Sequence, residues 1–460
     1  MIFDLARIPS SALTLSRARF CLFLAAAVLL PTGLCVAQSS VVPLADQFQI
    51  NTYLPSAPQP GYVAFESNEN VWVFWRQSSS TETPDESSLI ARRFDPTGKP
   101  IGPERLVNAP RNPPAPGLYL DIPEPNALVT GADGSSLLAV WTYNRDRHIF
   151  GNEDYDIQGR LLGPDGFGDV FQINTLEGIQ AHAQAAALDD GSYVVIWRGL
   201  ELWGRRIGAD GSLLGSEFQI NPAAFGDGSE TMLLGYTVTD LRDGSFMVVW
   251  QEQDVESGDI SILARSYLYD GTASVEEHQL FTTNQSVTAL TLLPRYPLSV
   301  TTLPSGGFFM AWTLNSNLYS DMYVQGFDAE WGSLGDPILV GEDRYATSLQ
   351  PQQVLTRPDG TIWLLRTIAS TEGIDVQLER RAADGPLLEE SFNVHNLSSG
   401  AQNTGHFALH PSGRIVAAWT TFGPSPGDDQ EASLQGRIFL PTEIFADGFE
   451  SGTLDGWIVE

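Results

Sequence analysis

Short apolar runs that end in tryptophan recur along the chain, and a polar turn precedes each of them. In DGSYVVIW (190–197), for example, Asp-Gly-Ser leads into an uninterrupted apolar run. Successive runs end 53 to 66 residues apart, and repetition on this scale is typical of repeat architectures. The seven members are NENVWVFW (68–75), DGSSLLAVW (133–141), DGSYVVIW (190–197), DGSFMVVW (243–250), SGGFFMAW (305–312), DGTIWLLR (359–366) and SGRIVAAW (412–419).

Each unit contains two further strand-like segments after the tryptophan run. The first carries arginine and ends in a second turn, as in LWGRRIGADG (202–211). The second is related to FQIN, which occurs at 171–174 and 218–221. With the segment that leads into the first turn, each unit predicts four short strands, which is the content of one propeller blade. The seven units therefore predict an all-β fold, a seven-bladed β-propeller of four-stranded blades.

The order of these segments also predicts how the ring closes. The last unit has no FQIN-like segment after it, whereas an additional FQIN stands at 48–51, before the first complete unit. Closure of a ring removes the exposed sheet edges that an open stack of units would carry. We therefore expect the N-terminal strand 48–51 to join the last blade.

The composition of the strands agrees with blades that stack face to face. Runs such as YVVIW (193–197) are continuously apolar, which predicts that neighbouring blades cover both faces of the sheet. The adjacent Asp-Gly pairs predict two-residue hairpin turns, where glycine supplies a positive φ. Arg366 stands where a seventh tryptophan is expected, which indicates a degenerate blade.

The units resemble tandem β-repeats of secreted and surface proteins of bacteria. In that pattern an Asp-Gly turn, a valine-rich strand ending in tryptophan, an arginine-containing strand and Gly-x-Glu-Phe-Gln-x-Asn follow one another. DGSYVVIW (190–197), GRRIGADGSLLGSEFQIN (204–221) and DGSFMVVW (243–250) carry the resemblance. It implies an extracellular binding or adhesive module and brings no catalytic residues. The segment IFADGFESGTLDGW (444–457) is similar to a C-terminal segment of many exported proteins of Gram-negative bacteria.

The N-terminus predicts a secretory signal peptide. Arg7, Arg17 and Arg19 precede an apolar run at 20–30 that is too short to span a bilayer, and Cys35-Val36-Ala37 provides a cleavage pattern. We expect a signal peptide at 1–37, the propeller at 38–443 and a short tail at 444–460. The predicted location is secreted, periplasmic or at the cell surface. Both cysteines fall within 1–37, so the mature chain is expected to hold no disulfide.

The charge balance limits the classes of partner. The chain has 56 acidic and 25 basic side chains, a net charge of −31 at pH 7. Such a surface repels nucleic acid and anionic lipid, so we expect neither as a partner and no membrane span. A protein or a glycan remains as a possible partner of a chain that we expect to be monomeric. No cofactor is expected, although an acidic face leaves calcium open as a ligand.

Residues that recur in most blades are expected to serve the repeat instead of a site. This applies to the turn aspartates, such as Asp190, and to the arginines Arg92, Arg160, Arg205, Arg265 and Arg437. The sequence lacks the Asp-box of sialidases, EF-hand and RTX calcium loops, Gly-x-Ser-x-Gly and His-Glu-x-x-His. His406 and His410 are four residues apart, which in a strand is too far for a shared metal ion. No catalytic, cofactor or metal residue is therefore assigned.

Loops that the blades do not share are the better place to look for a site. The longest such insertion joins the second and third strands of its blade at 142–156. The sequence thus favours a non-catalytic binding or scaffold module that uses loops on one face. The alternative is a hydrolase or lyase acting on polysaccharide, with carboxylates at the central funnel. The candidate ligand-binding residues of the insertion are Tyr143, Arg145, Asp146, His148, Glu153 and Asp154.

Overall fold

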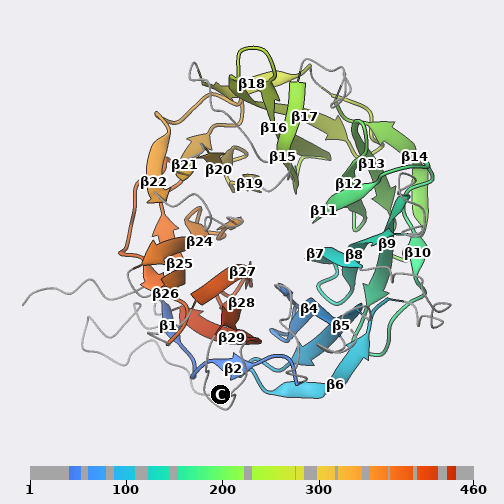
Figure 1. Cartoon of the computed structure of the whole chain (residues 1–460), viewed down its shortest axis with the longest axis vertical. Coiled ribbons are helices and arrows are strands. Elements are labelled where there is room, and N and C mark those ends of the chain that lie inside the picture. The colour runs from blue at the N-terminus through green and yellow to red at the C-terminus, as the bar shows by residue number, and fades with distance from the viewer. Residues whose placement is uncertain are drawn as a thin grey trace, which may run out of the picture. The chain divides into compact units, whose positions relative to one another are not determined.

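The structure is a computed structural model that describes residues 41–52, 61–78, 87–108, 123–144, 154–221, 231–274, 276–283, 298–315, 320–343, 353–370, 373–396, 401–422 and 432–441. These residues lie in a compact unit, residues 39–460, and all their regular elements are β-strands. The strands form seven antiparallel sheets that are arranged as the blades of a ring (Figure 1). The predicted seven-bladed β-propeller is confirmed.

In blades 1 to 6, four strands follow one another in sequence and in space. Blade 1 consists of β3 (Tyr62–Phe65), β4 (Val71–Ser78), β5 (Ser87–Phe94) and β6 (Pro100–Leu106). Blade 2 consists of β7 (Glu124–Thr130), β8 (Leu137–Asn144), β9 (Tyr155–Leu162) and β10 (Phe171–Gln172). Blade 3 consists of β11 (Ala181–Ala187), β12 (Tyr193–Arg198), β13 (Leu202–Ile207) and β14 (Leu213–Gln219).

The next three blades repeat this order. Blade 4 consists of β15 (Thr231–Asp240), β16 (Ser245–Asp254), β17 (Ile260–Leu268) and β18 (His278–Thr282). Blade 5 consists of β19 (Leu298–Thr302), β20 (Phe308–Asn315), β21 (Ser320–Phe327) and β22 (Ile338–Asp343). Blade 6 consists of β23 (Gln353–Thr356), β24 (Ile362–Ser370), β25 (Gly373–Arg381) and β26 (Phe392–Asn393).

Blade 7 combines strands that are far apart in the sequence. Strands β1 (Val41–Pro43) and β2 (Phe48–Gln49) both pair with β29 and complete the sheet. Phe48 lies opposite Gly436, and the Ile50 amide donates to the Leu434 carbonyl at 2.8 Å. The predicted closure by the N-terminal strand is confirmed, and β1 adds a second pairing segment. The other three strands are β27 (Ala401–Leu409), β28 (Ile415–Phe422) and β29 (Ala432–Pro441).

The first strand of each blade lies on the inside of the ring (Figure 1). These inner strands contact one another in order from β3 to β27, and β27 in turn contacts β3. Side chains extend the contacts, because Ser299 Oγ accepts from the Val354 amide at 3.0 Å and Gln353 Oε1 from the Phe407 amide at 2.9 Å. The ring is therefore closed at its inner wall as well as through β1 and β2.

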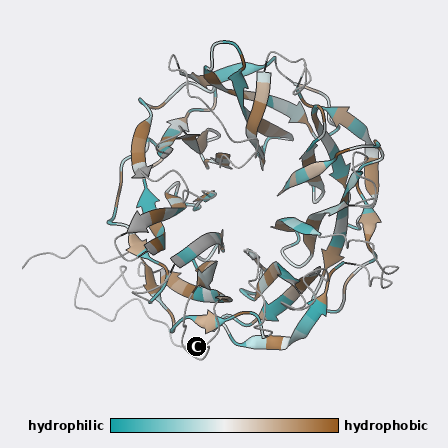
Figure 2. Ribbon diagram, in the orientation of Figure 1, coloured by the Kyte–Doolittle hydropathy of each residue, from teal (hydrophilic) through white to brown (hydrophobic). Residues whose placement is uncertain are grey.

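The hydrophobic core lies between the blades. Each of the seven blade junctions holds one cluster of buried apolar side chains from both neighbours, and hydrophobic segments recur around the ring (Figure 2). A fully buried tryptophan from the second strand packs into the junction with the preceding blade at every junction but one. Burial of such a side chain stabilises the fold by roughly 2–3 kcal/mol. The six are Trp75, Trp141, Trp197, Trp250, Trp312 and Trp419.

The hairpin between β11 and β12 shows what the Asp-Gly turns do. The Leu188 carbonyl accepts from the Gly191 amide at 2.9 Å, and the Leu188 amide donates to the Ser192 carbonyl at 2.8 Å. The loop therefore has three residues, 189–191, and the prediction of two-residue turns was wrong. Gly191 has a φ of 85°, which suits the glycine bulge of a three-residue hairpin loop. Asp190 Oδ1 accepts from the Ser192 amide at 3.0 Å, so the turn carboxylate serves the hairpin.

The asparagine that ends the FQIN-like segment has a structural role. Its buried side-chain oxygen accepts a hydrogen bond from a backbone amide near the start of the third strand, as Asn108 Oδ1 does from Leu89 at 2.9 Å. An amide left without a partner at such a buried site would cost about 1–3 kcal/mol. The same bond recurs in three other blades, from Leu434 to Asn51, Ile157 to Asn174 and Leu202 to Asn221.

The recurring arginines join one blade to the next. Arg205 Nη1 donates to the carbonyl of Ile173, in the fourth-strand segment of the preceding blade, at 2.9 Å. In blade 4, the Tyr267 hydroxyl makes the corresponding bond, to the Ile220 carbonyl at 2.7 Å. The predicted structural role is thus confirmed for most of these residues. The equivalent arginine bonds run from Arg92 to Ile50, from Arg160 to Val107 and from Arg437 to Val394.

Blade 6 departs from this pattern without losing its four strands. Arg366 occupies the tryptophan position on β24, and its guanidinium donates to the Val340 carbonyl of blade 5. The Val340 carbonyl has the same position in blade 5 as the carbonyls that the recurring arginines contact in other blades. Arg366 therefore makes the inter-blade bond from a neighbouring strand, so this departure from the repeat has a structural role.

Candidate functional site

The two faces of the ring carry different connections. In an antiparallel four-stranded blade, the turns after the first and third strands lie on one face, which we call the turn face. The loops after the second strand and the connections between blades lie on the other, which we call the loop face. The predicted ligand-binding insertion belongs to the loop face, between β8 and β9.

Two of the six predicted site residues lie within the described part of the chain. Tyr143 is half-buried near the end of β8 and packs against the cluster between blades 1 and 2. Asp154 precedes β9, and its Oδ1 accepts a hydrogen bond from the Gly178 amide at 3.1 Å. Asp154 thus anchors the connection from blade 2 to blade 3. The other four, Arg145, Asp146, His148 and Glu153, lie outside the described residues.

The connection that Asp154 anchors is itself firmly bonded. The Tyr155 amide donates to the Gly178 carbonyl at 3.2 Å, and the Gln180 amide donates to the Tyr155 carbonyl at 3.0 Å. The side-chain oxygen of buried Gln180 accepts from Trp197 Nε1 at 2.7 Å. Residues 176–180 are therefore held in place by blade 2 on one side and by blade 3 on the other.

The loop after β12 continues this surface. Its residue Gly199 packs closely against Gln180, since a Cβ atom on Gly199 would lie 3.0 Å from Gln180 Oε1. The Gly199 amide donates to the Glu201 carbonyl at 2.8 Å, which closes a tight turn with Leu200 at its tip. We call residues 154–155, 176–180 and 199–201 together the blade 2–3 platform.

Aliphatic side chains project from the platform into solvent. Leu200 is 73% exposed, Ile179 54% and Leu176 37%. Apolar side chains that are gathered on the surface of a folded protein commonly mark an interaction site. These residues were not predicted, because each belongs to one blade only and stands outside the repeated segments. Their position in connections unique to blades 2 and 3 is the signal that could have found them.

The platform also carries three carboxylates. Glu177 is exposed, and Asp154 and Glu201 are half-buried. Glu201 Oε2 accepts from Trp203 Nε1 at 3.4 Å, which orients this carboxylate beside the turn. Arg198, half-buried at the end of β12, is the cation adjacent to the turn.

A second group of polar side chains lies on the inner wall of the ring. The rings of Tyr62 on β3 and His406 on β27 lie 4.1 Å apart between their centroids. Burial lowers the pKa of His406 to about 4, so its imidazole is neutral near pH 7. Burial raises the pKa of Tyr62, and the Glu124 carboxylate raises it further. Arg76 Nη1 lies 4.0 Å from Glu124 Oε1.

A close pair of carboxyl groups occurs on the turn face. The Tyr269 hydroxyl donates to Asp240 Oδ1 at 2.7 Å and accepts from the Asp189 amide at 3.2 Å. Burial, with the nearby Asp189 carboxylate, raises the pKa of Asp240 to about 6. This pair spans the junction of blades 3 and 4. It is separate from the Tyr62–His406 group, so these residues do not assemble the acid pair of a glycosidase on the wall beside His406.

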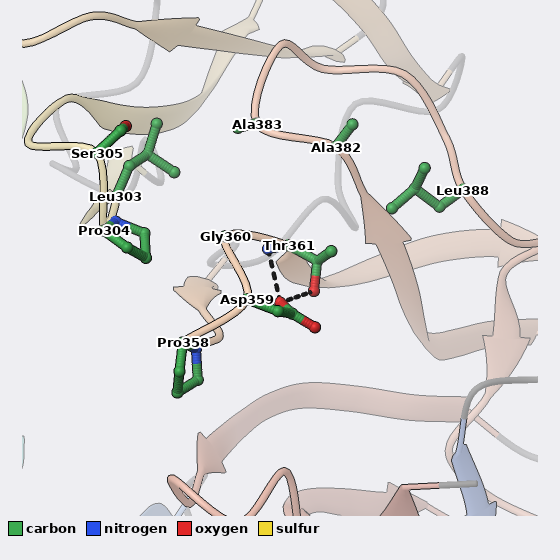
Figure 3. A pocket seen from close by; sticks show the side chains of 10 residues that line it. All are labelled: Leu303, Pro304, Ser305, Pro358, Asp359, Gly360, Thr361, Ala382, Ala383 and Leu388. Atoms are coloured by element: carbon green, nitrogen blue, oxygen red, sulfur yellow. Dashed lines mark hydrogen bonds between the residues drawn. The ribbon is translucent and has the colours of Figure 1, made fainter. Parts of the chain in front are cut away.

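A cavity of about 450 Å³ lies at the turn face between blades 5 and 6. Figure 3 shows that three turns line it, which contain Leu303, Asp359 and Leu388. Asp359 Oδ1 accepts from the amide and the hydroxyl of Thr361 at 2.9 and 2.6 Å. Asp359 is the single acidic residue of this lining and acts in its own turn. The cavity therefore has no paired acids.

The described ranges of the chain contain no cluster of three or more His, Cys, Asp or Glu side chains with a geometry suited to a metal ion. These ranges also contain no helix with the length and apolar character needed to cross a membrane.

Comparison with known proteins gives a likeness in fold and no family. No protein-family model and no curated protein sequence matches the chain. An ulvan lyase of polysaccharide lyase family PL25 is 11% identical, with 86% of this chain and 95% of that chain covered and a TM-score of 0.50. A protein of unknown function from Dyadobacter fermentans DSM 18053 is 12% identical over 88% of this chain and 100% of that chain, with a TM-score of 0.49. At 11% identity the likeness to the lyase shows the fold alone.

Proposed function

We propose that this protein is an exported, non-catalytic binding module that takes its ligand on the loop face of the propeller. The observation that carries the proposal is the blade 2–3 platform, where Leu200 and Ile179 are largely exposed on a backbone that neighbouring blades hold in place. Export rests on the N-terminal signal pattern. Calcium remains a prediction for the acidic loops, to be tested by titration against a chelator.

The exposure of Leu200 supports this assignment. Most large apolar side chains of the blades are buried in the junctions, and Leu200 is the most exposed large apolar side chain among the described residues. Leu200, at the tip of a three-residue loop, contributes little to any junction, so folding alone does not account for an aliphatic residue there. A preformed surface also loses little conformational entropy when it binds, which favours recognition.

Paired surface variants test the proposal. The variant L200S/I179S removes the aliphatic side chains of the platform, and L387S/L388S removes two leucines that are each 48% exposed on the turn face. Wild-type protein and both variants are applied to a glycan array and to an array of immobilised peptides. We expect binding by the wild type and by L387S/L388S that is lost in L200S/I179S. Absence of binding on both arrays, or equal binding by the two variants, would contradict the proposal.

An enzyme acting on polysaccharide is the second candidate, and the Tyr62–His406 contact favours it. A neutral imidazole beside a phenol, with Arg76 and Glu124 nearby, is a set of groups able to transfer protons. The net charge of −31 opposes binding of an acidic polysaccharide. Release of reducing ends or unsaturated products, lost in H406A and Y62F, would establish this activity. Absence of products from both neutral and acidic polysaccharides would exclude those substrates.

A further inference from the structure

We infer that the blade 2–3 platform binds a cationic segment of another protein in which lysine or arginine side chains accompany aliphatic ones. This inference rests on the proposed binding function and names the class of its partner. The platform offers three aliphatic side chains, Leu176, Ile179 and Leu200, on residues that the backbone joins into one surface.

The continuity of the platform allows one partner to contact both Ile179 and Leu200. Residues 178–180 pair with Tyr155 of blade 2, and Gln180 packs against Gly199 of the adjacent turn. Leu200 and Ile179 are thus carried by segments that contact each other. A partner that covers them removes apolar surface from water, which is the main favourable contribution in protein association.

The chemistry of the exposed groups points to a protein segment and not to a sugar. Sugars stack on planar aromatic faces, whereas the most exposed side chains of the platform are aliphatic. The nearby indole of Trp203 packs against the cluster between blades 2 and 3, and its Nε1 donates to Glu201. Aliphatic side chains of a peptide match Leu200 and Ile179 more closely than a hydrated sugar ring does.

The charge of the platform determines the sign of the charge expected on the partner. Asp154, Glu177 and Glu201 belong to the same segments as the aliphatic side chains, and Arg198 directly precedes the turn that carries Leu200. The whole chain carries a net charge of −31. This field accelerates the approach of a cationic partner and repels anionic polysaccharide, nucleic acid and acidic lipid. A basic and aliphatic protein segment satisfies both the charge and the apolar surface.

The test uses a short synthetic peptide of alternating lysine and leucine with the full-length secreted protein. Two comparison peptides replace leucine by serine or lysine by glutamate. The protein variants are L200S/I179S, E177Q/E201Q and, on the turn face, the matched control L387S/L388S. Glutamine at 201 retains an oxygen acceptor for Trp203. Circular dichroism and the melting midpoint show whether each variant is folded.

We expect the Lys/Leu peptide to bind the wild type and L387S/L388S equally, and L200S/I179S about tenfold more weakly. E177Q/E201Q should bind it several-fold more weakly and with a smaller dependence on salt. Both comparison peptides should bind the wild type more weakly than the Lys/Leu peptide does.

Equal affinity of L200S/I179S and L387S/L388S for the Lys/Leu peptide would overturn the inference. A glycan that binds the wild type and is lost in L200S/I179S, without any effect of these variants on the peptide, would leave the binding function standing and overturn only the partner class. Failure of both the glycan and the peptide measurements would overturn both.

Discussion

Arg366 and Glu379 form a buried ion pair within blade 6, with 3.3 Å between Arg366 Nη2 and Glu379 Oε2. Arg366 holds the position of the missing tryptophan on β24, and Glu379 holds the position of the recurring arginine on β25, opposite Leu364. The guanidinium that bridges to the preceding blade has thus moved to the adjacent strand. Glu379 also receives a hydrogen bond from Arg381. Each of these two exceptions to the repeat therefore supplies the charge that the other one needs.

We predict that either single change at this pair destabilises the fold strongly. R366Q leaves Glu379, which is 1% exposed, with one of its two arginine partners, and E379Q leaves the buried Arg366 without its carboxylate. Breaking a buried pair costs about 3–5 kcal/mol. The double variant R366W/E379R restores the residues of the other blades and should melt above both single variants. Additive losses in R366W, E379R and the double variant would show that the positions are not coupled.

Replacement of Asn108, which ends an FQIN-like segment, tests the buried hydrogen bond from its side chain to the third strand. N108A leaves the buried Leu89 amide without its acceptor, which should lower the free energy of unfolding by about 1–3 kcal/mol. The matched control is N393A, because Asn393 is exposed and its hydrogen bond to Gln377 is on the surface. Urea titration should separate the two variants. If N393A lowers the free energy of unfolding as much as N108A does, the buried hydrogen bond of Asn108 is not the cause.

Removal of the closing strands should open the ring. Deletion of residues 38–51 takes away β1 and β2 and leaves β29 with an unpaired edge, so we expect a lower melting midpoint and self-association in size-exclusion chromatography. I50A should by itself cost about 2–5 kcal/mol, because Ile50 is fully buried. V42A is the control, since Val42 is 40% exposed in the same segment. A monomeric deletion variant with unchanged melting would refute closure by this segment.

Protonation of Asp240 should stabilise the junction of blades 3 and 4. Because burial and Asp189 raise its pKa from 3.8 to about 6, the folded state binds the proton more tightly than the unfolded chain. The stabilisation from the protonated Asp240 carboxyl is therefore complete at a pH below 3.8, its pKa in the unfolded chain. It is lost as pH rises toward about 6. The melting midpoint of D240N relative to wild type should rise across this interval. A constant difference between the two proteins would contradict the shift.

His406 should give a pH dependence of the opposite sign. Its pKa falls from 6.5 to about 4 because it is buried, so on acidification the unfolded state takes up the proton first. Stability from the neutral imidazole is present above pH 6.5 and is lost as pH falls toward about 4. H406Q should therefore gain on wild type as pH falls, whereas D240N gains as pH rises. Parallel profiles for the two variants would contradict at least one of the two assignments.

Much of the fold could be predicted from the chain because each blade repeats the same local requirements. Trp197 and its counterparts marked one strand per blade, and the extra FQIN at 48–51 located the closing strand before any contact was known. The length of the turns was predicted less well, because the bulge at Gly191 depends on the pairing of Leu188 with Ser192. The structural role of Arg366 could not be predicted, because its partner Glu379 comes close to it only after β24 and β25 pair.

The candidate site depended far more on the tertiary structure. Asp154 was selected as a ligand-binding residue, but folding brings it to the Gly178 amide, where it supports the connection between blades. Leu200 and Ile179 attract no attention in the sequence, because single aliphatic residues are usually buried. Their exposure follows from where the connection and the turn lie against blades 2 and 3.

The sequence by itself determined the number of blades, their strand order and the closure of the ring, because these depend on patterns that recur within each unit. Only the tertiary structure decided which residues meet across the junctions, such as Arg366 with Val340 and Tyr62 with His406. It also decided which apolar side chains remain exposed. Such contacts join residues of different strands and blades, and their positions follow from the packing of the whole ring.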